Sequence, residues 1–182
     1  MALSSEEHDV SAGRKRSLAA VDFLETDQQT QIPQRLYSAA VRYLSAREHT
    51  ASELRQKFAR KFSREFSDEE VDALLEDLQA QGLQSDVRYA DVAVRSRVSR
   101  GYGPYYIEQS LRSKGVAPEI VHATESWQST DWLDVARQLK ERKFSSVTKE
   151  TRYEDPKAWQ KAVRTLQQRG FSSAIVARVI GD

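Results

Sequence analysis

The sequence contains no cysteine among its 182 residues and only three histidines. Without cysteine there can be no disulfide, no thiolate-bound zinc and no cysteine nucleophile. The histidines, His8, His49 and His122, lie far apart, and none belongs to a His-Glu-x-x-His pair. Such scattered histidines do not match the spacing of metal ligands, so we expect neither a metal ion nor another cofactor.

Long apolar runs are missing as well. The apolar stretch at residues 18–24 is short and is interrupted by Asp22. No segment approaches the roughly 20 apolar residues that cross a bilayer. Residues 1–16 are polar and carry both charge signs, which is not typical of a secretory signal. We therefore expect a soluble, cytoplasmic protein that has no membrane partner.

The net charge of +1 excludes a strong overall field that would draw the whole protein onto nucleic acid. The charges are nevertheless unevenly distributed. Residues 65–87 contain eight acidic residues and no basic one, whereas residues 88–114 contain six basic residues and two acidic ones, a local charge of +4. Both segments could be solvated helix faces, or the basic segment could bind an acidic partner.

The amino-terminal part of the sequence has a different composition from the rest. Residues 1–31 carry few large apolar side chains and many Ser, Glu, Asp and Gln, so burial cannot offset the entropy of ordering them. We predict a flexible tail there. The first helix is expected to start at Pro33, because Leu36, Ala40, Tyr43 and Leu44 follow at helical spacing.

Capping signals predict where the next helices begin. Thr50 with Glu53 and Ser67 with Glu70 both have the spacing of a capping box, in which each side chain satisfies a free backbone N–H. Asp86 is predicted to cap the helix that follows Gly82.

Glycine and proline divide the remainder of the chain. Pro104 is predicted to open a helix after Gly101 and Gly103, and Gly115 to end it. Further on, Asp131 should cap one helix, and Asp155 with Pro156 should open another after a polar loop at residues 145–154. Strand-like alternation is not sustained anywhere.

The middle and last blocks share a repeat. Five positions of the middle block, Leu111, Gly115, Val116, Ile120 and Val121, have the same offsets as Leu166, Gly170, Phe171, Ile175 and Val176. Each block has too small a core to fold alone, so tandem units should stack. The prediction is an all-α fold of three tandem three-helix repeats, at residues 32–83, 84–126 and 127–182, that form an elongated, curved molecule.

The middle block carries a family resemblance. Its sequence, SDVRYADVAVRSRVSRGYGPYYIEQSLRSKGV at residues 85–116, resembles the signature of the RecX family. The matching residues are Asp86, Arg88, Tyr89, Arg95, Ser96, Arg97, Arg100, Gly101, Tyr102, Gly103, Pro104, Ile107, Leu111, Gly115 and Val116. Residues 46–58 and 163–180 are similar to the first and last blocks of that family. The resemblance covers residues 33–181, apart from an insertion at 63–66 and the 145–154 loop.

The resemblance implies a regulator and not an enzyme. It implies a protein that lies in the groove of the RecA filament on single-stranded DNA and modulates the recombinase, ATPase and co-protease activities of RecA. The expected function is therefore regulation of DNA repair, of recombination and of the SOS response, through binding alone. No heptad seam indicates a coiled-coil dimer, so we expect a monomer.

The candidate binding residues are basic or aromatic side chains of the middle block: Arg88, Arg95, Arg97, Arg100, Tyr102, Tyr105, Arg112 and Lys114. An arginine fork can grip a carboxylate of RecA or a DNA phosphate with two hydrogen bonds. The alternative for each arginine is a solvated side chain with weak surface ion pairs. The residues Gly101, Gly103, Pro104 and Gly115 are expected to form structural turns.

Two other functions compete with this interpretation. A plain DNA-binding module would bind naked DNA with a steep salt dependence, but a net charge near zero predicts only weak direct contact. A helical scaffold for an unrelated protein would not affect RecA. The tryptophans Trp127, Trp132 and Trp159 are expected to belong to the core. No serine lies in a nucleophile elbow and no Gly-rich phosphate loop is present.

Overall fold

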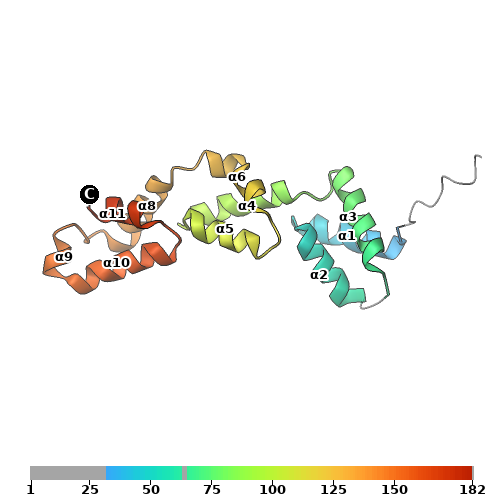
Figure 1. Ribbon diagram of the computed structural model, residues 1–182, viewed down its shortest axis with the longest axis horizontal. Helices are drawn as coiled ribbons and strands as arrows, with labels where there is room; N and C mark the ends of the chain where they lie inside the picture. Colours follow the sequence, from blue (N-terminus) through green and yellow to red (C-terminus); the bar gives the residue numbers. More distant parts are fainter. Residues whose placement is uncertain (1–31, 63–64, 182) are drawn as a thin grey trace, which may run out of the picture. The chain divides into compact units, whose positions relative to one another are not determined.

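The computed structural model describes residues 32–62 and 65–181, so the predicted tail lies outside the described residues. Throughout these two ranges the regular structure is helical, without a strand, which confirms the predicted all-α class (Figure 1). The helices are α1 (Gln34–Ala46), α2 (Ala51–Phe62), α3 (Asp68–Ala80), α4 (Asp86–Ser99), α5 (Pro104–Arg112), α6 (Pro118–His122), α7 (Glu125–Gln128), α8 (Trp132–Phe144), α9 (Thr151–Glu154), α10 (Pro156–Gln168) and α11 (Ser173–Gly181). None of the described helices is long and apolar enough to cross a membrane.

Several helices begin as their capping residues predict. The Ser67 hydroxyl accepts a hydrogen bond from the Glu70 amide at 3.2 Å, and the Ser67 amide donates to the Glu70 carboxylate at 2.8 Å, which completes the capping box of α3. Asp131 caps α8, and Asp155 caps α10. Pro104 occupies the first position of α5, where its missing N–H costs nothing.

The predicted cap of α4 is wrong. Ser85, not Asp86, is the N-cap, and its hydroxyl accepts a hydrogen bond from the Arg88 amide. The Asp86 carboxylate instead accepts hydrogen bonds from the Ala51 amide at 3.0 Å and from the Gln84 side chain at 2.7 Å. The Asp86 carboxylate is therefore bonded to a backbone amide 35 residues away in the sequence, and the neighbouring Ser85 caps the helix.

Two further expectations need correction. At the start of α2 the Thr50 hydroxyl accepts a hydrogen bond from the Glu53 amide at 2.9 Å, as predicted. The Glu53 carboxylate does not return to the Thr50 amide, because it pairs with nearby basic groups. The polar loop predicted at residues 145–154 contains the short helix α9.

The buried apolar side chains form three separate clusters, one for each group of three main helices. The best-buried members are Leu36, Leu54, Phe58, Leu74 and Leu78 in the first cluster; Val94, Ile107, Leu111, Val116 and Val121 in the second; and Leu139, Leu166, Phe171, Val176 and Ile180 in the third. Leu111 and Leu166 occupy equivalent places in their clusters, as the repeat predicts. Trp127 and Trp132 pack against the second cluster and Trp159 against the third. The exact repeat boundaries and the curved, elongated shape stay predictions.

Candidate binding surface of the middle repeat

Helix α2 of the first repeat contacts the turn after α5 of the middle repeat. The Thr50 hydroxyl, at the start of α2, donates to the backbone carbonyl of Lys114 at 2.8 Å. The next residue, Gly115, has a positive φ of +79°, and a Cβ placed there would lie 2.5 Å from Cβ of Ser52. Glycine is therefore required at this turn for both its conformation and its close approach.

The middle repeat contacts the last repeat in the same way. The Gly103 amide, at the start of α5, donates to the Arg169 carbonyl at 2.7 Å, and the Tyr105 amide donates to the Gly170 carbonyl at 3.2 Å. Gly170 has φ +89°, and a Cβ there would lie 2.3 Å from the Tyr106 nitrogen. In both junctions, the start of the second helix of one repeat bonds to the backbone beside the glycine that ends the second helix of the next.

Two of the predicted binding residues hold the junction between the first and middle repeats. The Lys114 ammonium group lies 3.1 Å from the Glu53 carboxylate of α2. The Arg88 guanidinium donates to the Glu48 carboxylate at 2.9 Å and to the Leu83 carbonyl at 3.0 Å. Both side chains therefore have structural partners within the protein.

Two other candidates also have partners within the protein: Arg97 bonds inside the middle repeat, and Tyr102 lies at the junction with the last repeat. The Arg97 guanidinium donates to the Ser110 hydroxyl of α5 at 2.9 Å and to the Ala93 carbonyl at 3.2 Å. The Tyr102 ring stacks on Tyr106, with centroids 4.1 Å apart, and the Arg169 guanidinium lies 4.4 Å from the Tyr102 centroid. Arg97 joins α4 to α5, and Tyr102 joins the middle repeat to the last.

The remaining four candidates, Arg95, Arg100, Tyr105 and Arg112, are exposed. Arg95 forms an ion pair with Asp91 one turn away, at 3.3 Å, and such an exposed pair contributes little stability. Tyr105 is 65% exposed and shares a face of α5 with Arg112, seven residues later. Within residues 32–62 and 65–181, the side chains of Arg100 and Arg112 form no ion pair. All four side chains are thus exposed, and Arg95 alone among them has an ion-pair partner in the described ranges.

A group of charges around the buried Glu53, at the junction of the first and middle repeats, was not predicted from the sequence. Glu53 is only 9% exposed, and its carboxylate lies 3.1 Å from Lys114, 3.2 Å from Arg47 and 3.2 Å from the His49 ring. Burial alone would raise the pKa of Glu53, but hydrogen bonds from Lys114 and Arg47 outweigh that effect and lower it. Glu53 therefore stays ionised as the centre of the group.

His49 makes the stability of this group depend on pH. The ring is 3% exposed, and burial, followed by the charge of Arg47, lowers the pKa of His49 below its usual value although Glu53 opposes the shift. The unfolded chain therefore binds a proton at His49 more readily than the folded protein does. Stability from the neutral ring is fully present above the unfolded pKa of about 6.5 and is lost as the pH falls below it.

We expect the free energy of unfolding of the wild type to fall between pH 7.5 and 5, and to fall less in His49→Gln. Urea unfolding followed by circular dichroism at several pH values measures this difference. His8, His122 and the carboxylates are common to both proteins, so the comparison isolates His49. Parallel pH curves for the two proteins would contradict the shift.

Comparison with known protein families gives the same three-part division. Three RecX family profiles match in order: the first three-helix domain at residues 37–78, the second at 85–124 and the third at 129–180. The regulatory protein RecX of Halorhodospira halophila is 42% identical over 135 residues, which are 74% of this chain and 80% of the relative. The regulatory protein RecX of Legionella pneumophila strain Corby is 32% identical over 146 residues, or 80% of this chain and 93% of the relative.

Solved structures agree in fold. The crystal structure of RecX from Lactobacillus salivarius superposes with a TM-score of 0.65 at 24% identity, covering 80% of this chain and 92% of that one. A second crystal structure of a regulatory protein RecX gives a TM-score of 0.64 at 26% identity, covering 80% and 70% of the two chains.

Proposed function

The chain belongs to the RecX family of regulatory proteins, and from this membership we propose that it binds the RecA filament on single-stranded DNA and lowers RecA activity. The observation that carries the proposal is the match of all three three-helix domains, in order, to the family. Regulation then needs binding alone, with no bond made or broken by this protein. Among the described residues, no group of three or more His, Asp or Glu side chains could hold a metal ion.

The exposed side chains of the middle repeat are our candidates for contact with the filament. Arg100 and Arg112 have no ion-pair partner in the described part of the chain, and Arg95 has only one on its own helix. Each can form a bidentate hydrogen-bonded pair with a carboxylate of RecA or a phosphate of the DNA. Tyr105 adds an exposed aromatic ring beside Arg112, and such rings often anchor protein interfaces.

The test is a variant with Arg95, Arg100 and Arg112 all changed to Ala. We expect its affinity for RecA filaments, measured by co-sedimentation with RecA on single-stranded DNA, to fall roughly tenfold or more, because charged pairs at an interface carry much of its specificity and binding rate. Arg88, Arg97 and Lys114 are left unchanged, since their side chains hold the fold together.

A matched control removes three exposed basic side chains from the other repeats: Arg42, Arg60 and Lys143. It changes the net charge by the same amount and should bind filaments almost as well as the wild type. Equal binding by all three proteins would reject the middle repeat as the contact surface. Tight, salt-sensitive binding of the wild type to DNA without RecA would instead favour a DNA-binding module.

A further inference from the structure

An apolar groove of about 700 Å³ opens in the last repeat. Its walls are two helices that each present side chains at helical spacing. Helix α10 contributes Trp159 and Val163, and α11 contributes Val176, Ala177 and Ile180. Helix α9 forms the edge, where the Tyr153 side chain is 81% exposed. The walls are apolar, and the polar part of the lining consists of Lys149, Glu150, Arg152, Glu154, Gln167 and Ser173. Aliphatic side chains such as Val163, Val176 and Ile180 suit the side chains of a bound peptide better than the flat faces of nucleobases.

The same position in the middle repeat is polar. The repeat offset places Val163 where α5 has Glu108, and Ala177 where α6 ends with His122. Glu108 and His122 pair there at 3.1 Å, and Trp127 lies against His122 with ring centroids 4.8 Å apart. The last repeat has thus replaced an ion pair with an open apolar surface. The core of the repeat does not need apolar residues at these two positions, because Glu108 and His122 are partly exposed in the middle repeat.

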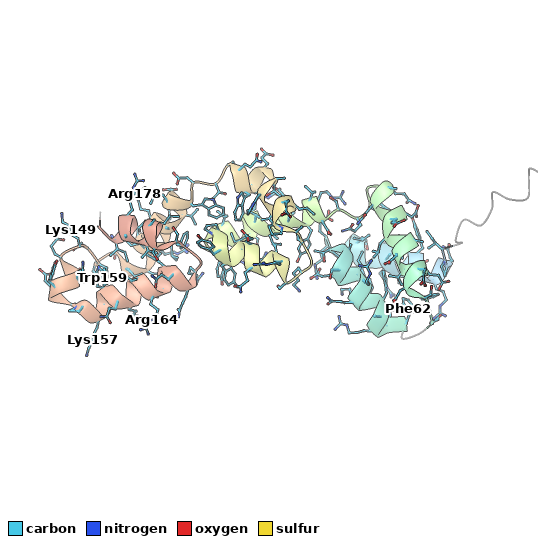
Figure 2. The ribbon with its side chains drawn as sticks, viewed as in Figure 1. Phe62, Lys149, Lys157, Trp159, Arg164 and Arg178 are labelled. Atoms are coloured by element: carbon cyan, nitrogen blue, oxygen red, sulfur yellow. The ribbon has the colours of Figure 1, made fainter. Side chains whose placement is uncertain are left out.

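The charge around the groove is positive. Residues 149–181 contain seven basic residues and three acidic ones, and α10 and α11 contain four basic residues and no acidic one. The lining itself holds two basic and two acidic side chains, Lys149 and Arg152 with Glu150 and Glu154. Glu150 accepts a hydrogen bond from Thr148 and pairs with Lys149, and the third acidic residue, Asp155, caps α10. The positive excess therefore comes from basic residues of α10 and α11 outside the lining. Figure 2 shows basic side chains on both sides of Trp159 in this view, with Lys149 and Arg178 above it and Lys157 and Arg164 below.

These basic groups are largely unpaired. Lys157, Arg164 and Arg178 are exposed and form no ion pair with any side chain that the structure describes. The Arg152 guanidinium lies 5.4 Å from the Trp159 centroid, at the edge of the groove. Lys157, Arg164 and Arg178 thus form a basic rim outside the lining. An apolar floor with such a rim is complementary to a helix with one apolar face and acidic residues around it.

We propose that this groove is a second docking surface, which binds an acidic amphipathic helix of a partner protein. The apolar side chains of that helix would enter between α10 and α11, and its carboxylates would meet the basic rim. This proposal concerns the last repeat and does not depend on the arginines of the middle repeat.

The probe for the test is a fluorescent helical peptide of about 15 residues with leucine at i, i+4 and i+7 and glutamate on the opposite face. A second peptide replaces every glutamate with lysine. The variant is Ala177→Glu, which puts a charged side chain into the groove. The control is Ala174→Glu, an exposed alanine of the same helix that does not line the groove.

We expect fluorescence anisotropy to show that the glutamate peptide binds the wild type and Ala174→Glu equally. Binding to Ala177→Glu should be weaker by roughly tenfold or more, as for a residue near the centre of an interface. The lysine peptide should bind poorly, and added salt should weaken the binding of the glutamate peptide. Arg152→Glu, at the exposed edge of the groove, gives a second variant that leaves the core unchanged, should Ala177→Glu fold poorly.

Three results would overturn the proposal. The glutamate peptide could fail to bind, or the lysine peptide could bind as well as the glutamate peptide. A labelled single strand of oligothymidine could also bind in place of the peptide and lose affinity in Ala177→Glu, which would make the groove a nucleic-acid surface. Loss of RecA binding in the arginine variant of the middle repeat would leave peptide binding here unchanged.

Discussion

Replacing Gly170 with alanine is expected to destabilise the protein by about 2–4 kcal/mol, from a strained backbone and an overpacked contact. Gly170 has φ +89°, where a residue with a Cβ is disfavoured. The added Cβ would also lie 2.3 Å from the Tyr106 nitrogen, and backbone cannot move aside as a flexible side chain can. The change therefore acts on the junction between the middle and last repeats as well as on one turn.

Gly82→Ala is the matched control for the junction. Gly82 also has a positive φ, +68°, but a Cβ there would meet nothing within 4 Å. Gly82→Ala should therefore lower the stability by only about 1–2 kcal/mol, the cost of holding alanine in a left-handed conformation. Urea unfolding by circular dichroism compares the two variants, and amide hydrogen exchange in α5 and α10 reports on the junction itself. Equal losses of stability in both variants would contradict the close approach of Gly170 to Tyr106.

Glu53→Ala is expected to cost about 2–3 kcal/mol, because hydrogen bonds from charged donors are lost and their partners are left partly buried. Lys114 would lose its partner across the junction of the first and middle repeats, and His49 would lose the acceptor for its ring. Arg47 and Lys114 are each about half exposed, so water can solvate them again, which limits the loss.

The control for this second prediction is Glu76→Ala. Glu76 is exposed on α3 and forms no ion pair with the described residues, so the expected change is within about 0.5 kcal/mol. Thermal unfolding of the two variants beside the wild type measures the difference. A Glu53→Ala protein as stable as Glu76→Ala would show that the charged group does not hold the junction.

Helix content and the repeat could be predicted from the sequence because their signals are local. Ser67 and Glu70 lie three residues apart and form the capping box that their spacing indicates. Pro104 and Asp155 mark helix starts for equally local reasons, a fixed φ and a short acceptor side chain. The 55-residue offset between Leu111 and Leu166 also holds in the structure, where both are fully buried.

Partners distant in sequence could not be predicted. Asp86 has the position of a helix cap, but its carboxylate accepts a hydrogen bond from the Ala51 amide, 35 residues earlier. Arg88 and Lys114 carry the charge expected of a binding surface, yet they pair with Glu48 and Glu53 of the first repeat. Sequence gives the charge of a side chain and its neighbours on one helix, but not which remote group reaches it.

The groove of the last repeat was missed for a different reason. Trp159 and Val163 have the spacing of a core helix, and the sequence predicted Trp159 as a core residue. The structure packs Trp159 against the third cluster but also leaves it in the wall of the groove. Helical spacing cannot separate a fully covered apolar face from one that is left open, because both have the same period.

Regulation of RecA is tested most simply by titrating this protein into the cognate RecA on single-stranded DNA, with ATP hydrolysis and strand exchange as readouts. We expect dose-dependent inhibition of both activities by the wild type and a weaker effect from the variant with Arg95, Arg100 and Arg112 changed to Ala. Unchanged RecA activity at every dose of the wild type would contradict this expectation.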